Sequence, residues 1–303
     1  MSEFFLEYVR ELIPESDIKL YEPMSAHITF RVGGVADIFI TPSSKKELCT
    51  LIKYLNLVER DYFVLGQGSN LLVGDHGYRG VIVHIGKKFS DIRVEENRIR
   101  AGAGALLSKI AAEAAEHSLT GFEFAAGIPG TAGGAIVMNA GAYGREMSDI
   151  VESVETVTTD GEYLVLKASE LGFGYRKSII RDEKLLVTEV TFRLEEGDKA
   201  SIRKRMEELQ NKRMEKQPLK FPSAGSTFKR PDGYFAGKLI MDAGLSGYRI
   251  GGAAVSEKHC GFIINIGNAS AADILDVIGD VQDKVLERFN VALEPEICII
   301  GDF

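Results

Sequence analysis

A glycine-rich segment from Phe124 to Gly144 carries the strongest chemical signal in the sequence. It reads FAAGIPGTAGGAIVMNAGAYG, with six glycines in twenty-one residues. Glycine loses more backbone freedom on folding than any other residue, so this density predicts a loop rather than a helix or strand. Without Cβ atoms, backbone N–H groups can approach a ligand closely, and phosphate oxygens are common ligands of such amide-lined loops. The segment therefore predicts a bound nucleotide.

A second loop of the same kind, Gly66–Asn70 (GQGSN), lies upstream between apolar runs at 62–65 and 71–73. Alone, a G-x-G pattern often marks only a turn, but two amide-rich loops together suit a diphosphate. Leu71 stands where a G-x-G-x-x-G fingerprint requires glycine, and the chain has no G-x-x-x-x-G-K-[ST] motif. The sequence therefore predicts a cofactor held by a fold other than the Rossmann sheet.

Three further positions carry side chains suited to acid–base or electrostatic catalysis. Arg176 is either half of a surface ion pair or a fixed pair of donors for a negative charge. Ser226 lies in a short loop beside two cations, where it is either part of a turn or a positioned hydroxyl. Glu296 directly precedes an apolar strand and is either a structural or a positioned carboxylate. From the residues alone, both interpretations of each position stay open.

The composition is that of an ordinary globular chain of 303 residues, 45% hydrophobic and 26% charged. The net charge of −8 argues against nucleic-acid binding, which usually requires a basic surface. No stretch approaches the ~20 apolar residues that cross a bilayer, and the acidic N-terminus does not resemble a signal peptide. Three cysteines without C-x-x-C spacing favour a reducing cytoplasm. The five histidines form no H-x-x-x-H or H-E-x-x-H pattern, so no metal site is predicted.

Helix and strand patterns surround these positions. Ser44 and Glu47 form a capping box ahead of an apolar helical face that ends near Val58. With an apolar run at 38–40, this helix predicts a β-α-β unit ending near Gly86. The other predicted elements are strands at 91–94 and 98–101, a helix at 106–117, a hairpin at 151–158 and 162–166, a strand at 185–194, helices at 199–216 and 236–243, strands near 253 and 262–266, a long helix after Ser270, and a buried closing strand at 297–300.

Motifs along almost the whole chain resemble the UDP-N-acetylenolpyruvoylglucosamine reductase family, flavoenzymes of peptidoglycan precursor synthesis. In the family's order, the chain has an HITFRVGG motif at 27–34, the loops at 66–70 and 127–144, Tyr175-Arg176, and segments at 225–229 and 293–296. The glycine loops alone indicate only a wider flavoprotein class that includes many oxidases, whereas Ser226 and Glu296 in their motifs make the resemblance specific. The chain resembles the shorter family variant, because Pro231 and Gly237 leave no room for an extra Tyr-bearing loop.

The resemblance implies an α+β fold. A two-part FAD-binding unit of the oxidase-like flavin class, not a Rossmann fold, is expected to be joined to a smaller α+β substrate-binding domain. The expected boundaries are 1–86 for the first FAD-binding part, with a C-terminal strand at 297–303, then 87–196 for the second part and 197–296 for the substrate-binding domain.

The implied activity is that of a UDP-N-acetylmuramate dehydrogenase. It is the NADPH-dependent, FAD-mediated reduction of UDP-N-acetylglucosamine enolpyruvate to UDP-N-acetylmuramate, which serves cell-wall biogenesis and hence cell shape and division. The resemblance implies FAD as cofactor, NADPH as co-substrate and a nucleotide sugar as the small-molecule partner. We expect the FAD to be non-covalent, because neither glycine loop contains a His or Cys that could attach the ring.

The resemblance also assigns roles to individual residues. Arg176 would stabilise negative charge on the carbon that bears the substrate carboxylate, Ser226 would deliver a proton, and Glu296 would orient or polarise the substrate. The expected cofactor-binding residues are Gly66, Gln67, Gly68, Ser69, Asn70, Gly127, Ile128, Pro129, Gly130, Thr131, Gly133 and Gly134. The expected substrate-binding residues are Tyr143, Arg230 and His259, the last two at the diphosphate.

Two rival functions remain open at this point. An FAD-dependent oxidase of an alcohol or hydroxy acid would explain both glycine loops, but it gives no reason for Ser226 and Glu296 in their motifs. A flavin- or nucleotide-binding module without catalysis, such as a sensor, would need neither of them, nor Arg176.

Overall fold

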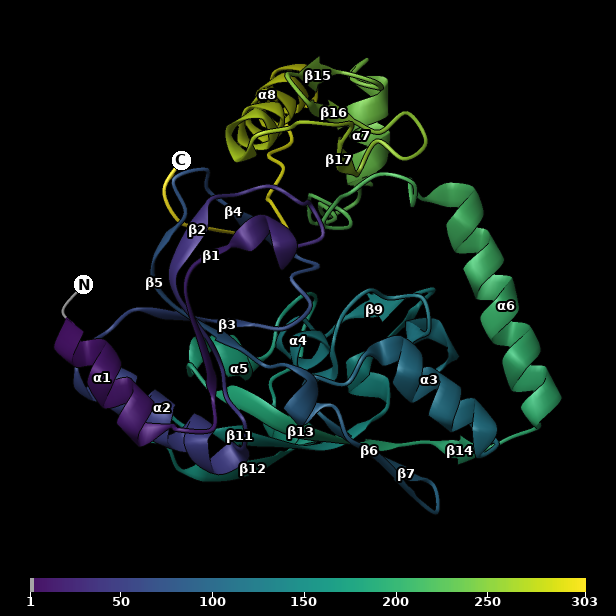
Figure 1. Cartoon of the computed structure of the whole chain (residues 1–303). Helices are drawn as coiled ribbons and strands as arrows, with labels where there is room; N and C mark the ends of the chain where they lie inside the picture. Colours follow the sequence, from purple (N-terminus) through teal and green to yellow (C-terminus); the bar gives the residue numbers. More distant parts are fainter. Residues whose placement is uncertain (1–2) are drawn as a thin grey trace. The chain divides into compact units, whose positions relative to one another are not determined.

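The computed structural model describes residues 3–303 and divides into two compact units (Figure 1). Unit 1 comprises residues 3–20, 38–67 and 80–211, and unit 2 comprises 21–37, 68–79 and 212–303. The boundaries expected at residues 86 and 196 both fall inside unit 1. The three-part division therefore stays a prediction.

A five-stranded antiparallel sheet forms the base of unit 1 (Figure 1). Its order is β12 (Tyr163–Lys167), β11 (Val151–Val157), β13 (Leu186–Arg193), β7 (Arg98–Gly102) and β6 (Ile92–Glu95). The β11–β12 pair confirms the predicted hairpin. Central strand β13 is buried along most of its length, as expected for a strand rich in Val and Thr with a neighbour on both sides.

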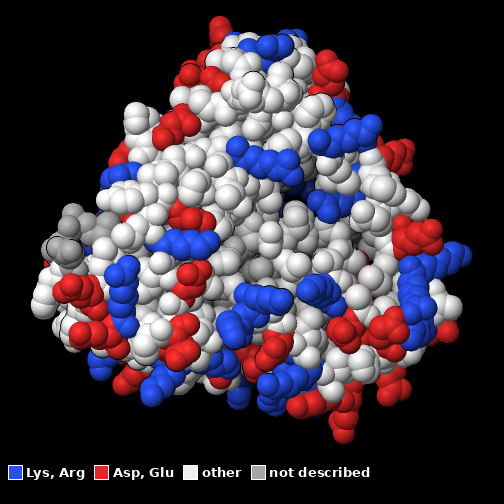
Figure 2. All heavy atoms as spheres, viewed as in Figure 1, with Lys and Arg blue, Asp and Glu red and all other residues white. Residues whose placement is uncertain are grey.

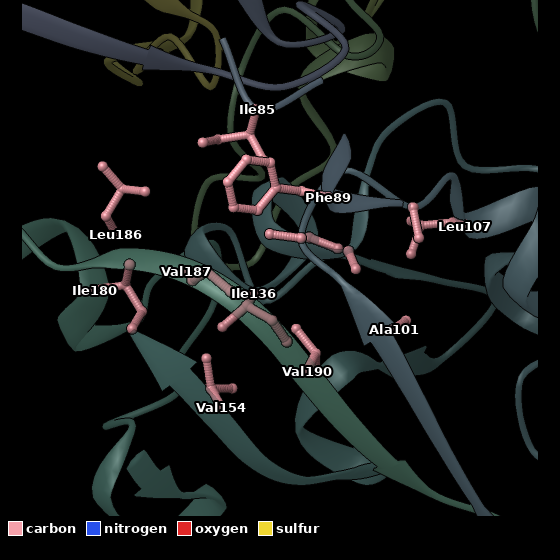
Figure 3. Close-up of a cluster of buried hydrophobic side chains, with 14 of the residues drawn as sticks. Ile85, Phe89, Ala101, Leu107, Ile136, Val154, Ile180, Leu186, Val187 and Val190 are labelled. Carbon is pink, nitrogen blue, oxygen red and sulfur yellow. The ribbon is translucent and has the colours of Figure 1, made fainter. Parts of the chain in front are cut away.

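Short helices pack against this sheet and complete the main core. They include α3 (Leu107–Glu116), α4 (Ala132–Val137) and α5 (Ile179–Asp182). Ile136 of α4 lies among Val154 of β11 and Val190 of β13, and all three are fully buried (Figure 3). Burying each such side chain stabilises the fold by about 1.5–3 kcal/mol.

The remaining part of unit 1 contains α1 (Glu3–Leu12), α2 (Lys45–Leu57) and β3 (Tyr62–Leu65). The Ser44 hydroxyl accepts the N–H of Glu47 at 3.3 Å, which confirms the predicted helix start. β3 runs parallel to β5 (Tyr78–His84) in a sheet of order β1–β2–β5–β3, where β1 is Asp17–Pro23 and β2 is Val35–Thr41. Two-residue strands complete the unit: β8 (Leu119–Thr120) with β14 (Glu195–Glu196), and β9 (Gly141–Ala142) with β10 (Arg145–Glu146).

The charged helix α6 (Lys199–Lys216) continues from unit 1 into unit 2. As predicted, Ile202 and Leu209 are buried on one face, and Met206 packs against the main core. The remaining face is rich in charged residues that contact water.

Unit 2 is built around helix α8 (Ala271–Phe289) and a small antiparallel sheet. The sheet contains β15 (Arg249–Ile250), β16 (Ala253–Val255) and β17 (Ile263–Asn265), and α7 (Ala236–Asp242) packs against α8. Ser270 and Asp273 form a capping box at the start of α8. The carboxylate of Asp75 accepts the N–H groups of Ala271 and Ala272 at 2.8 and 2.9 Å. The helix predicted after Ser270 is therefore confirmed.

The closing strand β18 (Cys298–Ile300) pairs in parallel with β4 (Leu71–Val73). The prediction of a buried closing strand at 297–300 holds at Ile297, which is 5% exposed, but it is wrong for β18 itself, because Ile299 is 36% exposed and its two neighbours are half-buried. The sheet alone does not explain this, since β4 is fully buried in the same two-stranded sheet; the exposure depends on what packs over β18, which its own residues do not encode.

The visible surface carries charges of both signs. Lys and Arg are interspersed with Asp and Glu on the face shown in Figure 2. From residue 3 onward, no helix combines the length and the apolar character needed to cross a membrane.

Candidate active site

The glycine-rich segment is not a continuous loop. Residues 132–137 form the short helix α4, so the prediction of a loop throughout is wrong there. The reason is tertiary packing: a Cβ on Gly133 would come 2.9 Å from the Cβ of Ala103, so only glycine allows this helix to lie so close to the end of β7. The N–H groups of Ala132 and Gly133 donate to the carbonyl oxygens of Ala105 and Ala103, both at 2.9 Å.

Within unit 1, the structure brings the start of the first loop against the second. A Cβ on Gly66 would come 2.7 Å from the Oγ1 atom of Thr131. Thr131 is itself buried and pairs in a β-bridge with Leu106. The two segments expected to bind one diphosphate therefore meet at Gly66 and Thr131.

The rest of the first loop lies in unit 2, on the HITFRVGG motif. The carbonyl oxygen of Gly68 accepts the N–H of Thr29 at 3.1 Å. Gly68 has φ +63°, and a Cβ there would overlap the carbonyl oxygen of His27, so this position requires glycine. The opening motif thus holds the first loop by its backbone.

These loops fit a flavin dinucleotide held by backbone groups. Neither Gly66–Asn70 nor Gly127–Gly134 contains Lys, Arg or His, so binding of a pyrophosphate there would depend on amide donors rather than on cations. Gly134 is exposed, and the nearest atom to a Cβ built on it is Thr131 Oγ1 at 3.7 Å, which leaves an open approach to the backbone. The assignment of individual residues in these two loops to FAD stays a prediction.

In unit 2, the segments that carry Ser226 and Glu296 are paired. The N–H of Glu296 donates to the carbonyl oxygen of Thr227 at 2.8 Å, and Phe228 forms a β-bridge with Pro295. Ser226 and Glu296 are both half-buried. The segments of Ser226 and Glu296 are far apart in sequence but are neighbours in the fold, as two residues of one active site must be.

Thr227, next to Ser226, makes hydrogen bonds to several of these segments, and this structural role was not expected from the sequence. It is fully buried, its N–H donates to Gly261 O at 2.8 Å, and its hydroxyl accepts the N–H of Ile263 at 3.0 Å. Asn70 of the first loop donates its side-chain N–H to the carbonyl oxygen of Glu296 at 3.2 Å. Glu296 is therefore held on both sides of its Cα.

Arg176 lies in unit 1 at the tip of a tight turn. Gly174 and Lys177 exchange both backbone hydrogen bonds, at 3.0 and 3.2 Å, which leaves Tyr175 and Arg176 as the two central residues. Arg176 has φ +54° and its guanidinium carbon lies 5.0 Å from the centre of the Tyr175 ring. The half-buried guanidinium is thus presented on a two-residue turn rather than on a long loop.

The three expected substrate contacts occupy different settings. Tyr143 of unit 1 is exposed, and its hydroxyl donates to Leu209 O in α6 at 3.0 Å. Arg230 of unit 2 is exposed, with its guanidinium carbon 3.9 Å from the centre of the Phe235 ring. Their role as substrate contacts stays a proposal.

His259 is partly buried in unit 2 with a defined tautomer. Its Nδ1 accepts the N–H of Gly261 at 3.2 Å, which places the ring proton on Nε2, and its ring packs edge-on against Phe262. Burial lowers the pKa of His259 below its usual value, so the ring is neutral near pH 7. The neutral ring can donate one hydrogen bond, from Nε2.

Among the described residues, no group of three or more His, Cys, Asp or Glu side chains is placed to hold a metal ion.

Comparisons with known proteins match both parts of the chain. Residues 36–167 match the FAD binding domain, and residues 217–300 match the UDP-N-acetylenolpyruvoylglucosamine reductase C-terminal domain. The chain is 52% identical over 302 residues to UDP-N-acetylenolpyruvoylglucosamine reductase from Caldanaerobacter subterraneus, with all of both chains covered. It is 49% identical over 297 residues to the Clostridium perfringens protein of the same name, covering 98% of this chain and 97% of that protein.

A solved structure agrees with these sequence relationships. The enzyme of this name from Thermus caldophilus superposes with a TM-score of 0.80 at 38% identity, covering 94% of this chain and 98% of the other. The expected α+β fold, a non-Rossmann FAD-binding unit with a substrate-binding domain, is thereby confirmed. The chain belongs to the UDP-N-acetylenolpyruvoylglucosamine reductase family.

Proposed function

We propose that the chain reduces the enolpyruvyl group of UDP-N-acetylglucosamine enolpyruvate, giving UDP-N-acetylmuramate, with Arg176, Ser226 and Glu296 as its catalytic side chains. Family membership makes it an FAD-dependent oxidoreductase that takes its electrons from NADPH. When bound, FAD supplies the relay of a hydride from NADPH to the methylene carbon of the enolpyruvyl ether. The observation that supports the proposal is the Glu296–Thr227 backbone bond, because it joins the segment that carries Ser226 to the segment that carries Glu296.

Arg176 stabilises the negative charge that develops on the substrate. Charge grows on the carbon that bears the carboxylate and spreads into that carboxylate. A guanidinium offers two parallel donors to such a group, which an ammonium cannot do. A preoriented donor of this kind typically contributes about 10²–10³ in rate.

Ser226 delivers the proton that completes the reduction. Its hydroxyl donates to the carbon that bears the carboxylate, as a general acid. Lys229, the nearest cation along the chain on the paired segment, is ion-paired to Glu294 at 2.9 Å. Because this ion pair partly compensates the charge of Lys229, that charge does little to lower the pKa of a neighbouring hydroxyl. The proton transfer is therefore favoured mainly by the basicity of the enolate-like carbon.

Glu296 orients the substrate or polarises it from the neighbouring segment. Its main chain is fixed through Thr227 on one side and Asn70 on the other. Arg230 and His259 are the proposed contacts to the diphosphate, and Tyr143 is a further proposed contact to the substrate. The partner of the protein is a small-molecule nucleotide sugar, and the proposal includes neither nucleic acid nor a membrane as a partner. We place the reaction in the cytoplasm, in peptidoglycan precursor synthesis, which agrees with three free cysteines.

Anaerobic mixing of the holoenzyme tests this function. NADPH should bleach the flavin absorbance, and the enolpyruvyl substrate added afterwards should restore it without oxygen while UDP-N-acetylmuramate appears. An oxidase of alcohols or hydroxy acids would instead be bleached by its own alcohol substrate rather than by NADPH, and it would regain its colour only with air. A binding module without catalysis would fail at the NADPH step.

A further inference from the structure

We propose that Asn139 and Ser178 are positioning residues that set the place of the Arg176 guanidinium. This inference rests on the proposed function, in which Arg176 acts on the substrate. Neither residue carries a charge, and neither was expected from the sequence to have a role. Both lie in unit 1 together with Arg176.

Asn139 is a fully buried polar residue within the glycine-rich segment, two residues after α4 ends. Its side-chain N–H donates to the carbonyl oxygen of Gly174 at 3.1 Å, and its side-chain oxygen accepts the N–H of Ser148 at 2.9 Å. It also has φ +40°, a conformation that Asn adopts more readily than most residues. The side-chain amide of Asn139 thus joins the glycine-rich segment to Gly174, the first residue of the turn that carries Arg176.

Ser178 fastens the other end of the same turn. Its side chain is 1% exposed, and its hydroxyl donates to the carbonyl oxygen of Val137 at 3.0 Å. Val137 is the last residue of α4. The segment Gly174–Ser178 is therefore tied at both ends to the α4 region, with Arg176 between the ties.

The turn needs such ties because its geometry is unfavourable for arginine. Position i+2 of a turn with positive φ is normally glycine, and Arg176 occupies it at φ +54°. Two internal backbone bonds define the turn but do not orient it against the sheet. Buried hydrogen bonds at Gly174 and Ser178 supply that orientation, and a misplacement of about 1 Å can cost about 10²-fold in rate.

Two variants and one matched control test the inference in the FAD-loaded enzyme. Asn139→Gly removes both side-chain bonds while tolerating the positive φ, and Ser178→Ala removes one buried hydroxyl-to-carbonyl bond. Thr156→Val removes an equivalent bond, from a fully buried hydroxyl to Leu164 O at 3.1 Å in the same unit, far along the chain from the turn. Flavin content, NADPH reduction rate and substrate-driven reoxidation rate are measured for each.

We expect both variants to slow the substrate half-reaction about 10- to 100-fold, with flavin content and NADPH reduction near wild type. Thr156→Val should leave all three readouts unchanged. In an Arg176→Ala background, Asn139→Gly should cause no further loss, because its effect passes through Arg176.

Three results would overturn the inference. The first is that Asn139→Gly or Ser178→Ala lowers the flavin content, while the fraction that still holds flavin is reoxidised at the wild-type rate. The second is that Thr156→Val slows reoxidation as much as these variants do, and the third is that Asn139→Gly slows reoxidation by the same factor with and without Arg176. Failure of the proposed function looks different: Arg176→Ala alone would then leave reoxidation by substrate at the wild-type rate.

Discussion

Glu296 and Thr227 are joined directly, by a backbone N–H to carbonyl hydrogen bond of 2.8 Å. Thr227 is in turn bonded to Gly261 and Ile263, so the Ser226 loop, the Glu296 segment and the His259 loop share one buried anchor. Preorganisation of this kind lowers the reorganisation needed during reaction.

The FAD of this enzyme should be non-covalent. Neither Gly66–Asn70 nor Gly127–Gly144 contains a His or Cys that could form a bond to the isoalloxazine ring. Acid precipitation of the purified holoenzyme should release all yellow colour into the supernatant. Colour that stays in the protein pellet would show a covalent link.

Gly68→Ala should weaken FAD binding about tenfold or more. Positive φ disfavours alanine by about 1–2 kcal/mol, and its Cβ would overlap the carbonyl oxygen of His27. Gly279→Ala is the matched control, because it lies in α8 with no atom within 4 Å of a Cβ and should be neutral or stabilising by up to about 1 kcal/mol. Fluorescence titration of the apoprotein with FAD compares them; equal affinities would contradict the role of Gly68.

The stability of unit 2 should fall as the pH is lowered through about 6.5. Burial lowers the pKa of His259, so the unfolded chain takes up the proton at a higher pH than the folded chain. The contribution of the neutral His259 ring to the free energy of unfolding is therefore complete above the pKa that His259 has in the unfolded chain. It is lost as the pH falls towards the lower pKa that His259 has in the folded chain. Urea unfolding at pH 7.5 and 5.5 measures the difference, which His259→Gln should reduce. An unchanged pH dependence in that variant would assign the effect to other groups.

Arg176→Lys and Glu296→Gln should each slow the substrate half-reaction and spare the reduction by NADPH. Lysine keeps the charge but loses the planar donor pair, so the expected loss is about 10²–10³ in rate, larger than the change in substrate affinity. Because both residues act on one developing charge, the double variant should lose less than the product of the single losses. Strict additivity together with unchanged single-turnover rates in both single variants would show that neither residue takes part in the chemistry.

Local patterns predicted α2, α3, α6, α7 and α8, whose determinants lie close together in sequence, but not α1 or α5. The box formed by Ser44 and Glu47 marks the start of α2, and Ser270 marks the start of α8. The helix α4 was not predictable this way, because two glycines oppose helix formation locally, and only the close approach to Ala103 in the fold explains Gly133. Exposure of Ile299 likewise depends on what packs over β18, because its partner β4 is buried in the same two-stranded sheet.

The candidate site was predictable through family resemblance more than through physics. The motifs identify Ser226 and Glu296, but no local rule places these two segments together, since the pairing through Thr227 is a long-range contact. The buried amide of Asn139 has no sequence signal either, because an Asn among glycines is equally typical of an exposed turn. Its partner, the carbonyl oxygen of Gly174, becomes visible only in the fold.

The most direct test of the account is the transient kinetics of Ser226→Ala. The proton is needed only after the substrate has accepted the hydride, so NADPH should bleach the flavin at nearly the wild-type rate. Anaerobic reoxidation by the enolpyruvyl substrate should slow by about 10²–10⁴-fold, the contribution of a general acid. An equal fall in both half-reactions, or wild-type reoxidation, would contradict the assignment of Ser226 as the proton donor.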